Sequence, residues 1–540
     1  MVQVEEMDIA QKFEAKLKTR LKPLNEITER GDSPIQQFYE GSTVFVTGGS
    51  GFLGKQLIEK LFRATKVSKV FVLLRSKKGK GIDQRLNQML QDPVYELLRE
   101  KQPDFAARIV PVEGDVAELR LGMTDKDWNM VAEQTDIIFH LAATTRFDEC
   151  LRVSTMINVR GAREALLLGK DCKKLKSYVH VSTAYSNACD TRINNGVLEE
   201  FYKPPVDPDT LIKLAETLDE DRLNNITPSF IKDWPNTYSF AKAVAEDLVS
   251  KYSNDLPICV VRPAIVICAE REPNPGWVDI SNIFGASGLV IGPGLGLMHV
   301  IFSDENFNLA LVPVDQVNNA IIAAAFKTAR QRTAGAHDTT IYTVTSTQRN
   351  PVNMGMLRNY MESLRYTYVC PKSVFYNFAW RTSNPTLLWI YTWLLHMIPA
   401  YLIDGVCLIL GKERRFVKLY TKMYKMTLAL SYFTVHGWNF IDDNTKALYD
   451  SLSTADKEIF DFDITKIDWR QYFITWCLGL RKYIIKDGLR GSAYGVKKQL
   501  VFKVIAYIMA LIYFYCLFKV IYFAFSLVML FLSFFSRYSF

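Results

Sequence analysis

Short apolar runs recur through the first half of the chain, and polar stretches that are compatible with helices separate them. The runs lie at residues 44–47, 70–74, 107–112, 136–141, 177–181 and 257–267. Strands that are buried on both faces of a parallel sheet have this continuous apolar character, and helices form the crossovers between them. The alternation predicts an α/β fold with a doubly wound parallel sheet, the Rossmann architecture.

Two later regions are too apolar for an ordinary soluble surface. Residues 387–410 are long enough to span a bilayer, but His396 and Asp404 would be costly at membrane depth. This segment is therefore expected to be buried or interfacial, with spanning as the alternative. Residues 504–535 are apolar apart from Lys519 and a few hydroxyl groups. They predict a membrane segment, either one tilted span with Lys519 snorkelling to an interface or a hairpin that bends near Lys519; a buried core hairpin is the remaining alternative.

These patterns divide the chain into four parts. We expect an N-terminal helix or arm at residues 1–35, a dinucleotide-binding domain at 36–370, a smaller and mostly helical domain at 371–500, and a hydrophobic membrane segment at 501–540. Residues 187–234 interrupt the strand and helix alternation with prolines and one amphipathic section. Long interruptions within a domain are usually functional, so this one is a candidate lid.

Charge and cysteine spacing restrict the classes of ligand and the compartment that the chain fits. The net charge of +8 is modest for 540 residues, and the basic clusters lack interleaved aromatic residues, so we expect no nucleic acid partner. Phosphorylated cofactors and anionic lipid headgroups fit those clusters better. The nine cysteines show no C-x-x-C spacing, which predicts no metal site and no disulfide framework in a reducing compartment. The N-terminus lacks the apolar core of a signal peptide, and cations at 482–498 precede the last segment, so the catalytic part is expected in the cytosol.

The first candidate site is the glycine-rich turn within residues 44–55, where a β-branched run ends and a helix begins. Gly48, Gly51 and Gly54 have the spacing of a dinucleotide-binding turn. In that turn glycines permit a positive φ, close approach of the backbone to pyrophosphate, and close contact of helix and strand. The phosphates would lie at the helix N-terminus.

The ends of the next strands carry further candidates. Arg75 and Lys77 stand where an NAD enzyme has an acidic residue, which favours the 2′-phosphate of NADPH, although a solvated basic loop has the same composition. Asp115 is placed to contact the adenine, or is simply a turn residue. Ala142 and Ala143 are small enough to let the cofactor approach the backbone.

Tyr238 and Lys242 lie four residues apart and therefore on one face of a predicted helix. A phenol has a reference pKa near 10, and a neighbouring ammonium is expected to lower that pKa, which would make the phenol a usable proton donor. Ser182 or Thr183 at the mouth of an earlier strand would supply a hydrogen bond to the same substrate oxygen.

Several motifs together resemble one known family. They are TGGSGFLGK, LLRSKKG, HVSTAY, PNTYSFAKAVAE, VVRPAIV, EPNPGWVD and VPVDQVNNA, followed downstream by IYTVTS, HMIPAYLID, GWNF, IDWRQY and GLRKYI. In this order they resemble the eukaryotic fatty acyl-CoA reductases, particularly the insect set, over residues 36–486. The resemblance implies an extended short-chain dehydrogenase fold and NADPH-dependent reduction of a long-chain acyl-CoA to a primary alcohol through a hemithioacetal and an aldehyde.

The resemblance also assigns residues. It implies Tyr238 and Lys242 as the catalytic pair, Thr183 or Ser182 as the carbonyl hydrogen-bonder, and Asn158 as the support of a proton-relay water. The implied cofactor-binding set consists of Thr47, Gly48, Gly51, Phe52, Leu53, Gly54, Arg75, Lys77, Asp115, Val116, Ala142, Ala143, Tyr238, Lys242, Pro263 and Ile265.

Three positions depart from the family pattern. Leu295 and His299 stand where Lys and Arg are common, and Gly437 stands where an acidic residue is usual. Loss of two cations would remove potential partners for the CoA phosphates, so CoA affinity and chain-length preference are the properties expected to differ from the family pattern.

Two other functions fit parts of the sequence. A hydroxysteroid dehydrogenase-like enzyme would share everything through Lys242, and a catalytically silent lipid-binding scaffold would keep the fold without the chemistry. For the reductase, we expect long-chain acyl-CoA and membrane lipid as partners. The expected location is the endoplasmic reticulum membrane, with the peroxisome or the lipid droplet surface as alternatives.

Overall fold

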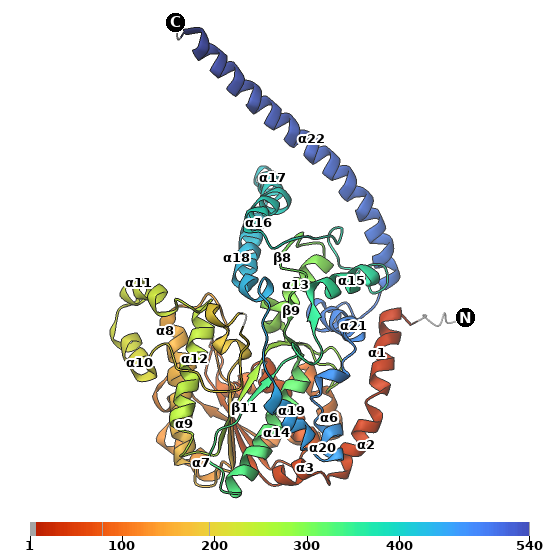
Figure 1. The fold of residues 1–540 in the computed structure, drawn as a ribbon. Coiled ribbons are helices and arrows are strands. Elements are labelled where there is room, and N and C mark those ends of the chain that lie inside the picture. The colour runs from red at the N-terminus through yellow and green to blue at the C-terminus, as the bar shows by residue number, and fades with distance from the viewer. Residues whose placement is uncertain (1–6, 78, 194, 539–540) are drawn as a thin grey trace, which may run out of the picture.

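A parallel sheet of seven strands forms the centre of the molecule (Figure 1). The computed structural model describes residues 7–77, 79–193 and 195–538. The strand order is β11-β6-β5-β4-β1-β2-β3, and every neighbouring pair in it is parallel. The strands are β1 (Thr43–Thr47), β2 (Lys69–Leu74), β3 (Ile109–Glu113), β4 (Ile137–His140), β5 (Ser177–Val181), β6 (Ile258–Pro263) and β11 (Ile341–Val344). The predicted doubly wound Rossmann sheet is confirmed.

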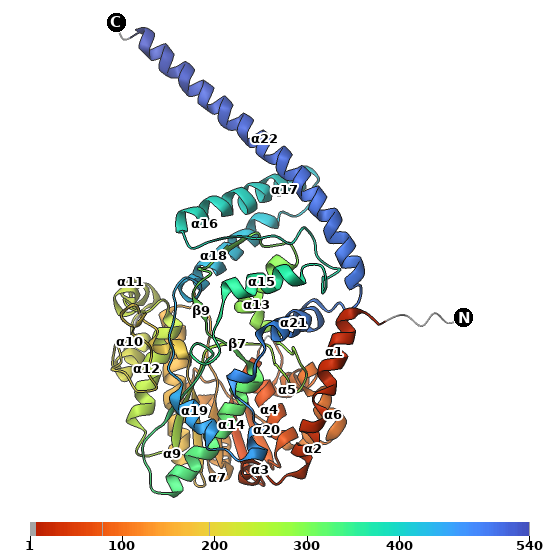
Figure 2. The same ribbon diagram turned by 45° about the vertical axis from the view of Figure 1, so that its right-hand side comes forward.

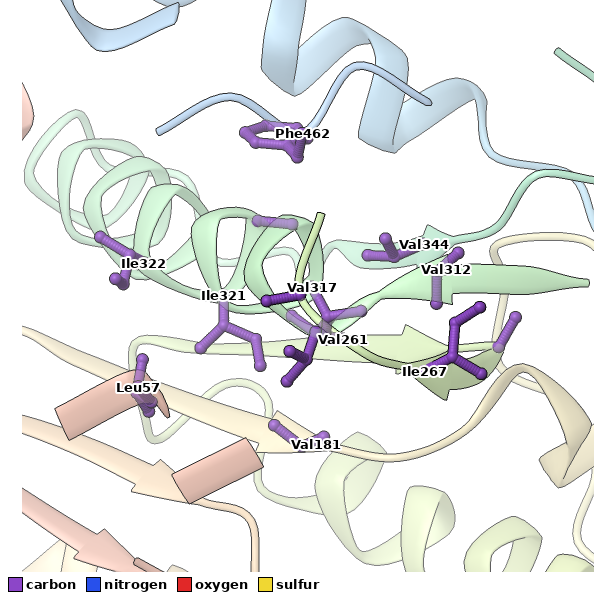
Figure 3. Packing of buried hydrophobic residues seen from close by; sticks show 14 of the residues in the cluster. Leu57, Val181, Val261, Ile267, Val312, Val317, Ile321, Ile322, Val344 and Phe462 are labelled. Atoms are coloured by element: carbon purple, nitrogen blue, oxygen red, sulfur yellow. The ribbon is translucent and has the colours of Figure 1, made fainter. Parts of the chain in front are cut away.

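Helices cover both faces of this sheet, and successive residues of one strand serve different cores. On β1, Val44 and Val46 join one hydrophobic cluster and Phe45 joins the other. Figure 3 shows the first cluster, in which Val317 and Ile321 lie against Val261 of β6. The main flanking helices are α4 (Phe52–Ala64), α5 (Ile82–Leu90), α7 (Asp125–Gln134), α9 (Gly161–Asp171), α12 (Thr237–Lys251) and α14 (Val314–Thr333).

The apolar run at 257–267 forms two strands rather than one. After β6 the chain leaves the main sheet, and β7 (Ile265–Ile267) pairs instead with β10 (Leu311–Pro313). The N–H of Ala264 still donates to Val344, whereas the N–H of Ile265 donates to Ala310. Pro263, which has no N–H to donate, stands at the change of partner.

The candidate lid, residues 187–234, is about half helical. It contains α10 (Pro208–Thr217) and α11 (Glu220–Phe230), capped by the side chains of Asp207 and Asp219. These helices pack beside α8 (Leu151–Ser154) and α12. Closure over a substrate remains a prediction for this segment.

The N-terminal region forms helices that pack on the rest of the chain. They are α1 (Ile9–Thr19), α2 (Lys22–Arg30) and α3 (Pro34–Tyr39). Lys482 pairs with Glu14 at 2.6 Å, and the side chain of Asp8 accepts the N–H of Ser492. The N-terminal helix α1 therefore lies beside the start of α22, whose far end points away from the rest of the molecule (Figure 2).

The C-terminal half is mostly helical. Its helices are α13 (Ala286–Gly294), α15 (Met354–Leu364), α16 (Pro385–Thr392), α17 (Ile398–Ile409), α18 (Phe416–Thr434), α19 (Asp443–Asp450), α20 (Thr454–Ile459), α21 (Trp469–Gly479) and α22 (Ser492–Tyr538). Helix α19 packs against β11 and α14, so part of the segment predicted as a separate domain lies on the dinucleotide-binding part.

Among the residues that the structure describes, two segments are long and apolar enough to cross a membrane, Pro385–Ile409 and Ser492–Ser533. Helix α22 runs without a break past Lys519, so the hairpin alternative is wrong for this structure. Its most apolar part is not buried in the protein, which also excludes the core hairpin. In residues 385–409 one face is buried in the protein and the remaining residues are exposed or half-buried. The expectation of burial therefore holds for that face, and an interfacial position of the rest stays a prediction.

Candidate active site

The glycine turn after β1 has the geometry that the sequence predicts. Gly48 has φ +73°, and a Cβ there would lie 2.7 Å from the backbone nitrogen of Ala142. A Cβ at Gly54 would lie 2.4 Å from the carbonyl oxygen of Gly48. Larger residues cannot occupy either position without displacing backbone.

This turn fits a nicotinamide dinucleotide. Gly51 is the N-cap residue of α4 and has no side chain. No side-chain oxygen therefore accepts hydrogen bonds from the N–H groups of the first helical turn. An N-terminus of this kind favours phosphate. Thr47 connects the end of β1 to the end of β4. Its hydroxyl is 2.9 Å from Nδ1 of His140 and accepts the N–H of Ala142. The carbonyl of Leu53 accepts a hydrogen bond from Asn318.

A partly buried ionic contact fixes the start of α4, and no sequence pattern predicted it. Lys55 Nζ lies 2.7 Å from Asp92 and 2.5 Å from Asp279. Trp277 donates its indole N–H to Asp92 at 3.0 Å, and its ring packs on Phe52 at 5.3 Å. The loop after β7 is thereby tied to the glycine turn.

Two guanidinium groups lie at the end of β2. Arg75 pairs with Asp115 at 2.9 Å, and the guanidinium of Arg85 donates to the carbonyl of Arg75 and, at 3.5 Å, to the hydroxyl of Ser50. Burial and the nearby charge of Arg75 both lower the pKa of Arg85. Two cations held this close favour an anion between them. Lys77 is exposed in the adjoining turn.

Arg85 was missed because it lies on α5, one helix away from the motif, and has no distinctive spacing. The remaining predicted cofactor residues lie where the strands end. The carbonyl of Val116 faces Gly161, Ala142 and Ala143 follow β4, and Pro263 and Ile265 stand at the change from β6 to β7.

Tyr238 and Lys242 lie on α12, whose first turn is capped by the side chain of Asn236. Lys242 is buried and donates from Nζ to the carbonyl of Val181 at 2.8 Å. The hydroxyl of Thr183 lies beside the phenol of Tyr238 and donates to the carbonyl of Pro263 at 3.3 Å. The ends of β5 and β6 thus meet the face of α12 that carries Tyr238 and Lys242.

The ionisation of this pair differs from the sequence-based expectation. Burial raises the pKa of Tyr238 to about 12, and the hydrogen bond with Thr183 acts in the opposite direction without overcoming it. Burial also lowers the pKa of Lys242 to about 8, against the opposing charge of Glu246. The expectation that Lys242 lowers the pKa of Tyr238 is wrong for this structure, because desolvation dominates and the ammonium donates to Val181.

Glu246 organises the wall behind the pair, and the sequence reading missed it. It accepts hydrogen bonds from the hydroxyls of Ser182 and Ser186 at 2.5 and 2.9 Å. Its carboxylate also pairs with the fully buried Arg262 at 2.7 Å. Because Ser182 is engaged there, the structure favours Thr183 as the hydroxyl that faces a substrate. The spacing of Lys242 and Glu246, one further helical turn, was the available signal.

Asn158 supports the loop after β4. Its amide oxygen accepts the N–H of Thr144 at 2.9 Å, and its amide nitrogen donates to the carbonyl of the same residue at 3.1 Å. Those contacts fix the backbone next to Ala142 and Ala143. Its part in a proton relay remains a prediction.

Aromatic residues from both halves of the chain surround Tyr238. Phe147 lies 5.9 Å from the Tyr238 ring and 5.0 Å from Phe433 of α18, measured between centroids. Tyr185 packs edge-on against Phe433 at 4.7 Å and against Phe440 at 4.9 Å. The C-terminal half therefore supplies apolar surface beside Tyr238, which no local sequence pattern indicates.

The three departures from the family pattern have structural explanations. His299 is buried, stacks on Phe378 at 4.4 Å, and has a pKa lowered by burial, so this position offers no cation to a phosphate. A Cβ at Gly437 would lie 2.8 Å from the ring of Phe307. Leu295 lines a small apolar pocket in the C-terminal half.

The sheet, the glycine turn and the Tyr238–Lys242 pair define a nicotinamide-dependent reductase of the extended short-chain dehydrogenase class. A family model described as "Male sterility protein", in its NAD-binding part, matches residues 46–321. A second model of the same description matches residues 395–487.

Curated relatives give the family. The Drosophila melanogaster protein "Fatty acyl-CoA reductase wat" is 36% identical over 88% of this chain and 91% of that relative. Human "Fatty acyl-CoA reductase 1" is 35% identical over 85% of this chain and 87% of that protein. The chain belongs to the fatty acyl-CoA reductase family.

Solved structures show the same fold at lower identity. The terminal R domain from the myxalamid biosynthetic pathway superposes with a TM-score of 0.55 at 21% identity, covering 82% of this chain and 92% of that domain. The reductase domain of a nonribosomal peptide synthetase from Mycobacterium tuberculosis gives 0.54 at 18% identity, covering 87% and 96%. These similarities extend over both halves of the chain.

Proposed function

We propose that this protein reduces long-chain acyl-CoA thioesters to primary alcohols with NADPH, at a membrane that α22 anchors, with its catalytic domain in the cytosol. The observation that carries the proposal is a chain of two aromatic contacts, from Phe433 to Phe147 and from Phe147 to Tyr238. These contacts place the C-terminal half of the chain beside the proposed proton donor. An apolar wall at this point suits an acyl chain.

The cofactor preference rests on the end of β2. Arg75 and Arg85 together favour the additional phosphate of NADPH over the free hydroxyl of NADH. When bound, NADPH supplies a hydride to the substrate carbonyl carbon in each of two reductions.

The side chains of the protein handle the oxygen and its proton. Tyr238 donates a proton to the carbonyl oxygen in the first reduction, giving a hemithioacetal, and Thr183 donates a hydrogen bond to the same oxygen. Collapse of the hemithioacetal breaks the C–S bond and passes the hydroxyl proton to the departing sulfur, so that CoA leaves as the thiol and an aldehyde remains, and Tyr238 regains its proton from solvent. A second proton from Tyr238 completes reduction of the aldehyde to the alcohol. Lys242, one helical turn from Tyr238, carries a positive charge that stabilises the phenolate left by each proton donation.

Membrane anchoring suits these substrates. A long acyl chain partitions into lipid, and the alcohol product does so more strongly because the CoA group has been lost. The exposed apolar length of α22 exceeds what a soluble surface tolerates. The endoplasmic reticulum is the proposed membrane, with peroxisomes and lipid droplets as alternatives that fluorescence microscopy of the tagged full chain separates.

The test is product formation by membranes that contain the full chain. NADPH or NADH is supplied with acyl-CoA thioesters of different chain lengths, and alcohol, aldehyde and free CoA are quantified. The proposal expects alcohol and CoA in equal amounts, with two NADPH consumed per alcohol. Oxidation of a steroid alcohol without acyl-CoA reduction would favour the dehydrogenase alternative, and no turnover with intact cofactor binding would favour the scaffold.

A further inference from the structure

Residues 385–410, which we call the α16–α17 surface, have one face on the protein and one face free. The segment comprises α16, the π-helical turn η8 (Trp393–Met397) and α17. Its buried residues recur at every fourth position, namely Leu388, Thr392, His396, Ala400 and Asp404. This spacing forms a single stripe along the helix.

The polar members of that stripe are satisfied by the protein. Nε2 of His396 accepts the N–H of His299 at 2.9 Å. The Asp404 carboxylate accepts the N–H groups of Arg415, Phe416 and Val417 at 2.9–3.1 Å and so caps α18. Crossing a bilayer would break these contacts and leave a carboxylate in lipid. The segment therefore stays on the protein although its composition permits a span.

The opposite face is apolar and exposed. Trp389 is 55% exposed, Leu402 is 60% exposed and Ile409 is 85% exposed. The other exposed apolar residues of the surface are Leu387, Trp393, Tyr401, Ile403, Val406, Leu408 and Leu410. Tryptophan and tyrosine among aliphatic side chains are typical of helices that lie in a membrane interface.

A basic rim follows this face directly. Residues 411–425 contain six cations, Lys412, Arg414, Arg415, Lys418, Lys422 and Lys425, and one acid, Glu413. Glu413 pairs with Arg415, and the side chains of Lys412, Arg414 and Lys418 are exposed. An apolar face beside clustered cations complements a bilayer with anionic headgroups.

The surface is also continuous with the anchor. The hydroxyl of Tyr513 on α22 donates to the carbonyl of Leu394 at 2.9 Å. Both views place α16, α17 and the exposed length of α22 at the end of the molecule away from the sheet (Figures 1 and 2). A bilayer that holds α22 would therefore also reach the α16–α17 surface.

We propose that the α16–α17 surface is a second membrane contact, which lies in the plane of the interface while α22 inserts, and that its basic rim binds anionic lipid headgroups. The inference rests on the proposed anchoring by α22. It also orients the enzyme, because α18 begins at the rim and ends beside the catalytic face at Phe433, a length of about 28 Å for its 19 residues.

The first test uses the full chain in vesicles of phosphatidylcholine with phosphatidylserine. A fluorescent amino acid is introduced singly at Leu402, at Ile512 of α22, or at the exposed polar Asn359 as a control. Nitroxide-labelled lipids should quench the probes at 402 and 512 strongly and the probe at 359 weakly. Omitting phosphatidylserine, or introducing Arg414→Glu with Lys418→Glu, should lower quenching at 402 severalfold and leave 512 unchanged.

The outcomes separate the two claims. Quenching at 512 without quenching at 402 overturns the inference and leaves the anchor standing, and no quenching at either position refutes both. If the probe at 402 is shielded from lipid nitroxide and from aqueous iodide alike, another protein surface, such as a second copy of the chain, covers it and the inference fails.

A second test distinguishes in-plane from spanning topology. Lys412→Asn with Arg414→Thr creates an N-glycosylation sequon immediately after α17. In microsomes this sequon should remain unmodified, while a matched sequon tag appended after Phe540 reports whether α22 crosses. Glycosylation at position 412 would show that residues 385–409 span and would overturn the inference.

Discussion

Replacing Thr183 with valine removes the hydroxyl beside Tyr238 and keeps the side-chain volume. Its present contact with the carbonyl of Pro263, at 3.3 Å, is long, so the hydroxyl can turn toward a substrate oxygen at little cost. Loss of one preorganised donor to a developing oxyanion typically lowers kcat by about 10² to 10³, or about 2.7–4 kcal/mol. We expect kcat for alcohol formation to fall by that factor, with little change in KM for acyl-CoA or in NADPH affinity.

Ser182→Ala is the matched control. Ser182 is buried and donates to Glu246, and Glu246 keeps Ser186 and Arg262 after the change. Loss of one hydrogen bond to a charged group should lower the free energy of unfolding by about 1.5–3 kcal/mol. Turnover at a temperature well below unfolding should remain within a few-fold of the wild-type rate.

The assay is alcohol formation by the detergent-solubilised full chain, with thermal unfolding followed on the same samples. A wild-type kcat in Thr183→Val would show that the Thr183 hydroxyl does not stabilise the developing oxyanion. Ser182→Ala must lose less activity than Thr183→Val while it remains folded and binds NADPH. An equal loss would show that the serine is the group that contacts substrate, and would refute the assignment of Thr183.

Three further predictions follow from the cofactor site, the buried lysine and the anchor. Arg75→Asp or Arg85→Ala should weaken NADPH binding about tenfold or more, measured by fluorescence titration, and leave NADH binding nearly unchanged; equal effects on both cofactors would contradict the assignment of this site. Burial lowers the pKa of Lys242 to about 8, so its positive charge is present below that pH and lost above it. We therefore expect kcat/KM to decline as the pH rises through about 8, and a plateau extending to pH 10 would show that turnover does not depend on this charge. Removing residues 503–540 should release the protein from membranes that high salt does not strip, with partial retention through the α16–α17 surface; an intact chain that washes off in salt or carbonate would exclude insertion of α22.

Local sequence patterns account for the sheet and the glycine turn. Six of the seven strands of the main sheet lie in the apolar runs of the sequence, β11 being the exception, and Gly48 and Gly54 stand where a side chain would meet backbone. Such constraints act within one βαβ unit, so they leave a readable spacing. The Tyr238–Lys242 pair is readable for the same reason, because four residues make one helical turn.

Long-range packing explains what the sequence did not reveal. The pKa of Tyr238 depends on burial by segments from distant parts of the chain, so the expected effect of Lys242 alone was incomplete. Phe433 and Arg85 reach the site from separate helices and have no motif of their own.

The C-terminal segments show the same limit. In residues 385–410, His396 and Asp404 look like obstacles to membrane contact until their partners are known, which are His299 just before β8 (Val300–Phe302) and residues 415–417 at the start of α18. A bend near Lys519 was equally compatible with composition, and only the continuous course of α22 excludes it.

Tyr238→Phe tests the proposed chemistry most directly, since the change removes one hydroxyl from the ring and leaves its aromatic packing with Phe147 available. Purified wild-type and variant chains are supplied with NADPH and a long-chain acyl-CoA, and fatty alcohol is quantified beside NADPH affinity. We expect the wild-type protein to form alcohol, and the variant to lose activity by about 10² to 10⁴ while binding NADPH with nearly unchanged affinity. Alcohol formation by Tyr238→Phe at close to the wild-type rate would contradict the assignment of Tyr238 as the proton donor.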